Sequence, residues 1–334
     1  MEKHKPRRIV GPWSLSDLGK IEGNGLKVFS CFHCGGGSTM GYKLAGFEVL
    51  GGVEIDPEMM AVYRVNHKPK HSYLMGVQDF VKISDAELPA ELFELDILDG
   101  SPPCSSFSMA GSREKKWGGE HHFREGQAAQ HLDDLFFDFI AVAKKLKPKV
   151  VIAENVKGLI QGKAKGYVKQ IFAGFKEAGY TTQLFLLNAA AMGVPQRRER
   201  TVFVAVRKDI MRRVKFAFNE EQIAVEKVYS GDSDSQATIS ESRFGDVLLD
   251  KKRAAPTLCT INRYFIKRNK QINDETIAKI QSFPNDYDFL KSSVKYICGM
   301  SVPPFMMQRI ALEIGRQVFD KDYDEQIFDN FSQK

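Results

Sequence analysis

Short apolar runs alternate with helix patterns from residue 27 to residue 206, and this alternation constrains the fold more than any other feature of the chain. Strand patterns are expected at residues 27–31, 47–56, 72–76, 95–98, 150–153, 181–187 and 201–206. Helix patterns lie between several of them, at residues 57–66, 132–146 and 167–178. Strands that alternate with helices are typical of parallel sheets covered on both faces. The sequence therefore predicts an α/β protein with a doubly wound, mostly parallel sheet.

The alternation ends after Val206, and the stretch that follows is irregular and basic. Residues 207–270 hold 14 Lys and Arg against 9 Asp and Glu, so this segment carries most of the net charge of +6. Such a concentration fits a polyanionic partner, although an ordinary solvated surface gives the same pattern. Helix patterns return at residues 274–282 and 305–318. The first 26 residues are polar and predict a loosely packed arm.

The composition is typical of an intracellular enzyme. A chain of 334 residues, 43% of them hydrophobic, can form one large α/β domain and a smaller one. The 5 cysteines are an odd, scattered set, which favours a reducing compartment over a disulfide framework. The basic N-terminus lacks the apolar stretch of a signal peptide, and no window reaches the roughly 18 apolar residues of a membrane span. We therefore expect a cytoplasmic protein without a membrane segment.

Cys104 is the strongest candidate for chemistry. It follows an apolar strand pattern and the pair Pro102-Pro103, and a Ser- and Gly-rich loop comes after it. Open α/β sheets bind their ligands at the carboxyl ends of the strands, which is where this cysteine falls. The rigid prolines fix the direction in which it enters the loop. We therefore predict a nucleophilic cysteine.

The remaining cysteines predict no comparable role. Cys31, Cys259 and Cys298 have the surroundings of small buried hydrophobic residues, and Cys34 replaces a small residue of a turn. The Cys31-x-x-Cys34 spacing with His33 between resembles half of a zinc site. No second pair at ligand spacing exists in the sequence, so we expect no metal.

An acid and two arginines complete the catalytic set. Glu154 follows the strand pattern of residues 150–153 and is placed to protonate a ring nitrogen, although a structural ion pair with an arginine is an alternative. Gln196, Arg198 and Arg200 alternate, so they share one face if the segment is extended. Two guanidinium groups on one face suit a carbonyl oxygen or a phosphate, and an edge strand with solvated arginines is the alternative.

A glycine-rich turn predicts a nucleoside-containing cofactor. Gly35-Gly36-Gly37 stand between the first strand pattern and a helix pattern, and Glu54 ends the second strand pattern. Glycines let the backbone approach a ligand, and an acid at this place accepts hydrogen bonds from ribose hydroxyls. Simple tight packing explains the glycines equally well. Asp79 could accept from an adenine amino group or could cap a surface helix. Residues 112–130 form a long basic loop that predicts either a mobile lid or a solvated surface loop.

Taken in order, these motifs resemble the DNA cytosine-5 methyltransferase family. The resemblance runs from about residue 27 to residue 317 and rests on the segments CGGGSTMGYKLAGF, VEID, QDF, GSPPCSSFSMAG, ENV, NAAAMGVPQRRER, SFPNDY and YICGMSVPP. It implies a Rossmann-like methyltransferase fold with S-adenosylmethionine as the cofactor. It divides the chain into an N-terminal extension (1–26), a catalytic and cofactor-binding domain (27–207), a smaller, irregular target-recognition domain (208–290) and a C-terminal segment that returns to the catalytic domain (291–334).

The resemblance also implies a mechanism and a set of site residues. Cys104 attacks C6 of a cytosine flipped out of the duplex, Glu154 protonates N3, Arg200 reaches the cytosine and Arg198 supports the pocket. The residues placed at the cofactor are Phe32, Gly35, Gly37, Glu54, Ile55, Asp79, Phe80, Pro103, Leu135 and Ser301. The residues expected to contact DNA are Ser108, Arg113, Lys115, Lys116, Lys251, Lys252 and Arg253.

We therefore expect a bacterial- or phage-type DNA cytosine-5 methyltransferase that acts as a monomer on double-stranded DNA. A cognate restriction endonuclease would share its sites without forming a stable complex. Cys34, Ser105 and Met300 depart from the family pattern. Two alternatives stay open: a tRNA cytosine-5 methyltransferase, and a catalytically silent DNA-binding protein of the same fold. The Cys-Phe-Thr tripeptide of the tRNA branch is not found around Cys259.

Overall fold

The computed structural model describes residues 11–103, 134–161, 165–232 and 245–320. It also gives the backbone of two paired two-residue strands, β5 (Glu120–His121) and β6 (Gln130–His131). Within these ranges, no helix combines the length and the apolar character that a membrane crossing requires.

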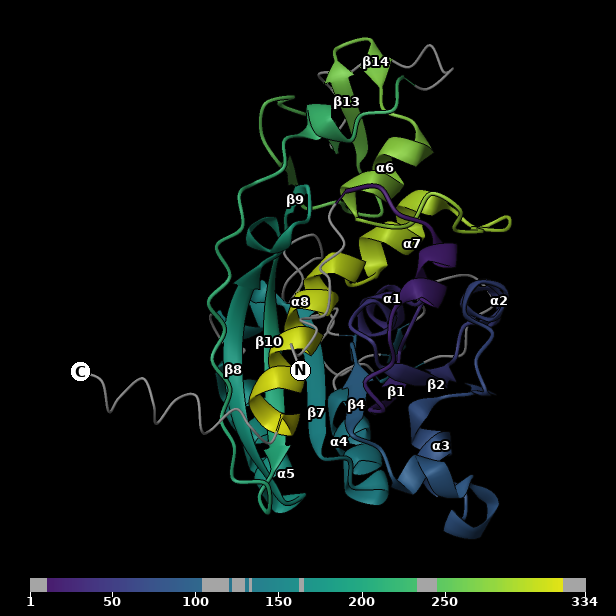
Figure 1. Cartoon of the computed structure of the whole chain (residues 1–334), viewed down its shortest axis with the longest axis vertical. Coiled ribbons are helices and arrows are strands. Elements are labelled where there is room, and N and C mark those ends of the chain that lie inside the picture. The colour runs from purple at the N-terminus through teal and green to yellow at the C-terminus, as the bar shows by residue number, and fades with distance from the viewer. Residues whose placement is uncertain are drawn as a thin grey trace, which may run out of the picture.

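A seven-stranded sheet forms the centre of the molecule, with the strand order β3-β2-β1-β4-β7-β10-β8 (Figure 1). Its strands are β1 (Lys27–Cys31), β2 (Glu48–Glu54), β3 (His71–Leu74), β4 (Ile97–Gly100), β7 (Val150–Val156), β8 (Tyr180–Asn188) and β10 (Glu199–Arg207). Neighbouring strands are parallel except around β10, which runs antiparallel to both β7 and β8. The predicted mostly parallel sheet is confirmed.

Helices cover both faces of this sheet. Successive residues of β7 point to opposite faces, so Val150 and Ile152 lie in one apolar cluster while Val151 and Ala153 lie in the other. The first cluster includes side chains of α1 (Gly37–Leu44), α2 (Pro57–His67) and α8 (Pro304–Ile314). The second includes side chains of α3 (Val77–Lys82), α4 (Leu135–Leu146) and α5 (Lys165–Glu177). The doubly wound arrangement follows from this two-sided core.

The N-terminal extension is not a loose arm over its described part, residues 11–26. Trp13 is 3% exposed, its ring lies 6.3 Å from the ring of Phe305, and its Nε1 donates to the Ser282 carbonyl oxygen over 2.9 Å. The Trp13 carbonyl oxygen in turn accepts from the Asn285 amide. The prediction was wrong because a single large aromatic side chain buries enough apolar surface to anchor a polar segment.

The region after β10 builds a second, smaller sheet beyond one end of the first (Figure 1). It has the order β11 (Asp246–Leu248), β13 (Arg263–Lys267), β14 (Lys270–Gln271). A separate short strand, β12 (Ala255–Pro256), pairs in parallel with β9 (Gln196–Arg197), which directly precedes β10. α6 (Asp274–Ile280) and α7 (Val294–Met300) follow, and α8 returns to pack against α1. The β9–β12 pair therefore joins the basic region to the Gln-x-Arg-x-Arg segment.

Candidate active site

The carboxyl ends of β4 and β7 meet at one edge of the sheet, because the two strands are parallel neighbours. Asn155, near the end of β7, ties this strand to the segment that follows β4: its Nδ2 donates to the Pro102 carbonyl oxygen over 3.0 Å, and its side chain is buried. Pro103, half-buried, is the last described residue before Cys104, which lies outside the described residues. Asn155 carried no predicted role, although its place beside Glu154 in the sequence was the available signal.

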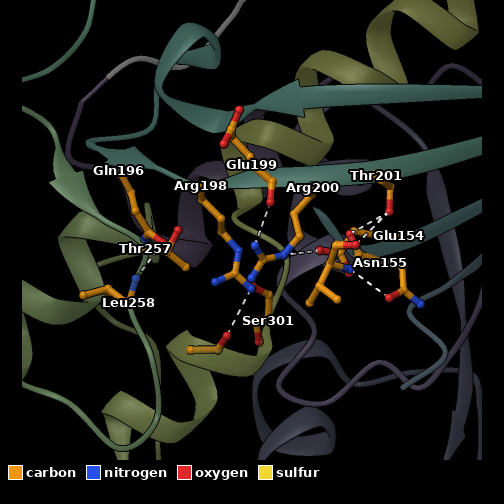
Figure 2. Close-up of polar contacts among 12 residues, drawn as sticks. Glu154, Asn155, Gln196, Arg198, Glu199, Arg200, Thr201, Thr257, Leu258 and Ser301 are labelled. Atoms are coloured by element: carbon orange, nitrogen blue, oxygen red, sulfur yellow. Dashed lines mark hydrogen bonds and ion pairs between the residues drawn. The ribbon is translucent and has the colours of Figure 1, made fainter. Parts of the chain in front are cut away.

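Glu154 and Arg200 form an ion pair at this edge (Figure 2). Arg200 Nε lies 2.9 Å from Glu154 Oε1, and about a tenth of each side chain is exposed, 12% and 10%. Arg200 Nη1 also donates to the carbonyl oxygen of Glu199 over 2.8 Å. Glu154 Oε1 has no hydrogen-bond partner among the described residues, so the contact with Arg200 is electrostatic. The ion pair left open as an alternative is present.

Arg198 is buried and forms hydrogen bonds with the end of α7. The residue is 2% exposed, and its Nη2 donates to the carbonyl oxygens of Gly299 and Ser301 over 3.0 and 3.1 Å. Burial, and then the charge of Arg200, lower the pKa of Arg198 to about 9, so it remains charged at neutral pH. Its Nε and Nη1 have no partner among the described residues. The alternative of an edge strand with solvated arginines is wrong.

Gln196 continues the same buried face, as the alternation predicts. It is fully buried, whereas Arg197 between it and Arg198 is exposed. Gln196 Oε1 accepts from the Leu258 amide over 3.0 Å, and its Nε2 donates to Oε1 of Gln281 over 2.6 Å. The face on which we expected substrate contacts therefore also joins three distant segments of the chain, those of Gln196, Leu258 and Gln281.

The glycine-rich turn is packed tightly against the C-terminal part of the chain. A Cβ on Gly35 would lie 2.6 Å from Ile297 Cγ2, and one on Gly37 would clash with the Val302 carbonyl oxygen and lie 2.9 Å from Ser301 Cβ. Tight packing, the alternative left open by the sequence, thus accounts for these glycines by itself. The loop before them is conformationally unusual, since Phe32 and Cys34 both have positive φ, 56° and 48°.

Glu54 is an acid held in place by backbone donors at the carboxyl end of β2. Its Oε1 accepts from the amides of Ile55 and Asp56 over 2.9 and 3.0 Å, and Oε2 accepts from the Cys34 amide over 2.9 Å. Burial raises the pKa of Glu54, and the backbone donors oppose that effect. Oε2 accepts one bond and keeps a lone pair free, so Glu54 can accept from a ribose hydroxyl.

The predicted cofactor residues Phe80 and Asp79 lie next to each other on α3 in different surroundings. The Phe80 side chain is fully buried and stacks on Phe29 with ring centroids 5.6 Å apart, so only its backbone could touch a ligand. Asp79 is exposed in the first turn of α3 and pairs with Lys82 over 2.9 Å, rather than capping the helix. The cap position belongs to Gly76. The predicted cofactor residue Leu135 opens α4 and is buried.

Three of the predicted DNA contacts lie on the turn after β11. Lys252 and Arg253 are exposed, and Lys251 Nζ sits 5.5 Å above the ring of Tyr229. Of the others, Ser108, Arg113, Lys115 and Lys116 lie outside the described residues, as does most of the predicted lid.

The described part of the chain groups no three His, Cys, Asp or Glu side chains as a metal would require. Cys31 and Cys298 are buried as predicted, and Cys259 is only half-buried.

The sheet order, with an acid and a guanidinium at its carboxyl edge, defines a Rossmann-like α/β protein of the methyltransferase type. Residues 26–271 match the family described as C-5 cytosine-specific DNA methylase, so the chain belongs to this family. The resemblance seen in the sequence is confirmed.

Curated relatives and solved structures agree with this assignment. The type II methyltransferase M.NgoPII of Neisseria gonorrhoeae is 34% identical over 199 residues, which are 58% of this chain and 51% of that protein. M.FnuDI of Fusobacterium nucleatum is 37% identical over 55% of this chain and 48% of that protein, so these two matches span about half of each relative. M1.HphI of Haemophilus parahaemolyticus is 28% identical, with 86% of both chains covered.

The solved structures show the fold. A candidate DNA modification methyltransferase encoded within an Escherichia coli prophage superposes with a TM-score of 0.66 at 19% identity, covering 88% of this chain and all of that one. A DNMT2 mutant of Spodoptera frugiperda superposes with a TM-score of 0.63 at 17% identity, covering 86% and 99%. At these identities the likeness is one of architecture, and the predicted methyltransferase fold is confirmed.

Proposed function

We propose that the chain transfers a methyl group from S-adenosylmethionine to C5 of cytosine in duplex DNA. The observation that carries this proposal is the pairing of Glu154 with Arg200 at the edge where Asn155 holds Pro102. Cys104 follows two residues after Pro102 in the sequence. An acid, a guanidinium and the segment leading to a cysteine thus come from three parts of the chain. Membership of the cytosine-specific methylase family supports the same reaction class.

In this proposal the protein makes a poor carbon nucleophile reactive. Cys104 adds to C6 of the flipped base, while Glu154 donates a proton toward N3. Arg200 holds Glu154 in position and faces the negative charge that develops on the base. S-adenosylmethionine, when bound, supplies an electrophilic methyl group. Removal of the C5 proton then allows Cys104 to leave.

The residues farther along the same edge of the sheet fit this cofactor. Glu54 has a free lone pair at the end of β2 and suits the ribose hydroxyls. Ser301 is buried, and its Oγ has no hydrogen-bond partner among the described residues, so it can take a polar group of the cofactor. Phe32 and Ile55 offer apolar surface, the first at the end of β1 and the second directly after Glu54.

The test uses covalent trapping on a duplex that contains 5-fluorocytosine, because fluorine at C5 blocks the final elimination. The wild-type chain with S-adenosylmethionine should give a complex that survives denaturation, and Cys104→Ala should give none while still binding the duplex. A wild-type chain that binds DNA without any trapped complex or transferred label would favour the catalytically silent alternative.

The nucleic-acid class is tested in the same assay. Transfer of labelled methyl groups to duplex DNA and not to tRNA is the expected outcome, and the reverse would move the chain to the tRNA alternative. The names of the relatives place them in bacterial type II systems and in Bacillus phages. We propose a similar protective role here, and base-resolution mapping of 5-methylcytosine in modified DNA would reveal the recognition sequence.

A further inference from the structure

Gln281 connects two parts of the site and was not singled out by the sequence. It follows α6, and its side chain is fully buried. Its Oε1 accepts from Gln196 Nε2 over 2.6 Å, and its Nε2 donates to the Ser301 carbonyl oxygen over 2.7 Å. Both ends of the amide are therefore occupied by groups from different segments, one before β10 and one after α7.

These two bonds belong to a longer line of buried hydrogen bonds, each of which shares a residue with the next. It starts at the Leu258 amide, which donates to Gln196 Oε1, and it ends at the Ser301 carbonyl oxygen, which also accepts from Arg198 Nη2. A backbone amide can only donate and a carbonyl oxygen can only accept, so the two ends of the line fix the orientation of both glutamine amides. Neither amide can flip without leaving buried polar groups unpaired.

The line joins the three regions that methyl transfer must hold in register. Leu258 follows β12 of the basic region, Ser301 borders the glycine turn, and Arg198 is two residues from Arg200 in the same extended segment. Gln281 is fully buried, so it cannot touch a substrate itself.

We propose that Gln281 is a positioning residue for the proposed methyl transfer, which it serves by holding Gln196 and the Ser301 turn at a fixed separation. The inference rests on the proposed function and deepens it. It identifies a residue that fixes the position of the recognition region relative to the segment that holds Arg198 and Arg200. Small displacements of reacting groups reduce catalytic rates strongly, so removal of this amide should appear mainly in kcat.

Gln308 is a matched control. It is also fully buried, its Nε2 donates to the Leu44 carbonyl oxygen over 3.1 Å, and its Oε1 accepts from Arg309 Nη1 over 2.5 Å. It lies on α8, where it joins that helix to α1, and its two bonds involve none of the site residues. Replacing either glutamine with methionine removes the same number of bonds, so a purely structural role predicts similar consequences for both.

The experiment compares Gln281→Met with Gln308→Met. Both should lower the melting temperature, but only Gln281→Met should lower kcat, by on the order of 10- to 100-fold. Only Gln281→Met should also weaken S-adenosylhomocysteine binding, by about 10-fold, because the Ser301 turn is deprived of a donor. Equal reductions of kcat in the two variants, or an unchanged kcat and cofactor affinity in Gln281→Met, would overturn the inference.

Gln281→Glu provides a second variant that separates the two bonds. A carboxylate still accepts from Gln196 but cannot donate to Ser301, whereas the protonated acid can do both. The kcat of this variant relative to wild type should therefore rise as the pH is lowered, and a ratio that stays flat would count against positioning. A wild-type chain inactive on every nucleic acid would refute the proposed function instead, and S-adenosylhomocysteine affinity would still report on Gln281.

Discussion

Arg200 Nε lies 2.9 Å from Glu154 Oε1, across two neighbouring antiparallel strands. Glu154 pairs in register with Val202, so Arg200 stands at the diagonal position on the same face and reaches the acid without leaving its strand. The antiparallel direction of β10 produces this contact, because it brings the start of that strand to the carboxyl end of β7. A parallel strand would have placed its arginines at the opposite edge of the sheet.

Replacing Glu154 should lower the rate of methyl transfer without weakening the binding of duplex DNA. Glu154→Gln keeps the shape of the side chain but removes its ability to give a proton, so kcat should fall about 10²- to 10⁴-fold while duplex affinity stays near wild type. Glu199→Gln is the control, since Glu199 lies on the neighbouring strand β10 and pairs with Lys157 over 2.8 Å at the surface. That variant should retain activity within about twofold. Comparable activity in both variants would exclude Glu154 as the acid.

Lys251, Lys252 and Arg253 should contact phosphates. Changing all three to glutamine should weaken duplex binding and flatten the slope of log affinity against log salt by up to about 2.7, because each phosphate that is no longer neutralised accounts for about 0.9. Lys165, Lys169 and Lys176 on the exposed side of α5 form a control set with the same charge change. Fluorescence anisotropy over a salt series measures both slopes, and identical slopes for the two sets would show that the turn after β11 does not face DNA.

Asp99 should make stability depend on pH. It is buried in β4, accepts from Ser30 and Ser38 over 2.8 and 2.7 Å, and burial raises its pKa from 3.8 to about 6. The folded state therefore holds the proton more tightly than the unfolded state, so stability is lost as the pH rises from about 4 to about 6 and stays lower above that. A difference of about 2 pKa units corresponds to about 3 kcal/mol as an upper figure.

Asp99→Asn should remove this dependence, because the amide resembles the protonated acid. The free energy of unfolding of the variant relative to wild type should rise between about pH 4 and pH 7 in urea titrations. The exposed Asp79→Asn serves as the comparison and should follow the wild-type curve. A difference between Asp99→Asn and wild type that does not change with pH would contradict the raised pKa.

Gly37→Ala should disturb the packing of the glycine turn. The new Cβ would clash with the Val302 carbonyl oxygen, which is backbone and cannot rotate away, so stability should fall by roughly 1–3 kcal/mol. S-adenosylhomocysteine affinity, measured by calorimetry, should fall with it because Ser301 is displaced too. Gly166→Ala is the control: it lies on α5 with nothing within 4 Å of an added Cβ, and it should be neutral or slightly stabilising. Full stability of Gly37→Ala would show that the turn can shift.

The alternation of strand and helix patterns was enough to predict the parallel sheet, because each pattern reflects local burial on two faces. Every strand predicted between residues 27 and 206 is present. The reversal of β10 could not be read from its residues, since VFVAV is equally apolar in either direction. Trp13 was misjudged for a related reason: the surface that buries it comes from residues 282 and 305.

The candidate site likewise contains residues that could be predicted from the sequence and residues that could not. Glu154 was recognised because an acid at the end of an apolar strand pattern is costly to bury, and Arg198 and Arg200 were recognised because they alternate in the sequence. Gln281 and Asn155 did not stand out, because a polar amide is ordinary in a sequence and acquires a role only from its hydrogen-bond partners. Phe80 was placed at the cofactor by the family resemblance, and the sequence did not show that its ring lies in the core.

The sequence by itself determined the class of fold, the family and the chemical types at the site, because periodicity and residue type are local properties. The tertiary structure alone decided which groups meet: that Arg200 pairs with Glu154, that Arg198 bonds to the end of α7, and that Gln281 joins Gln196 to Ser301. The bond from Arg198 to Ser301 spans 103 positions of the chain. No local pattern encodes such contacts, because strand direction and packing fix them only when the whole chain is folded.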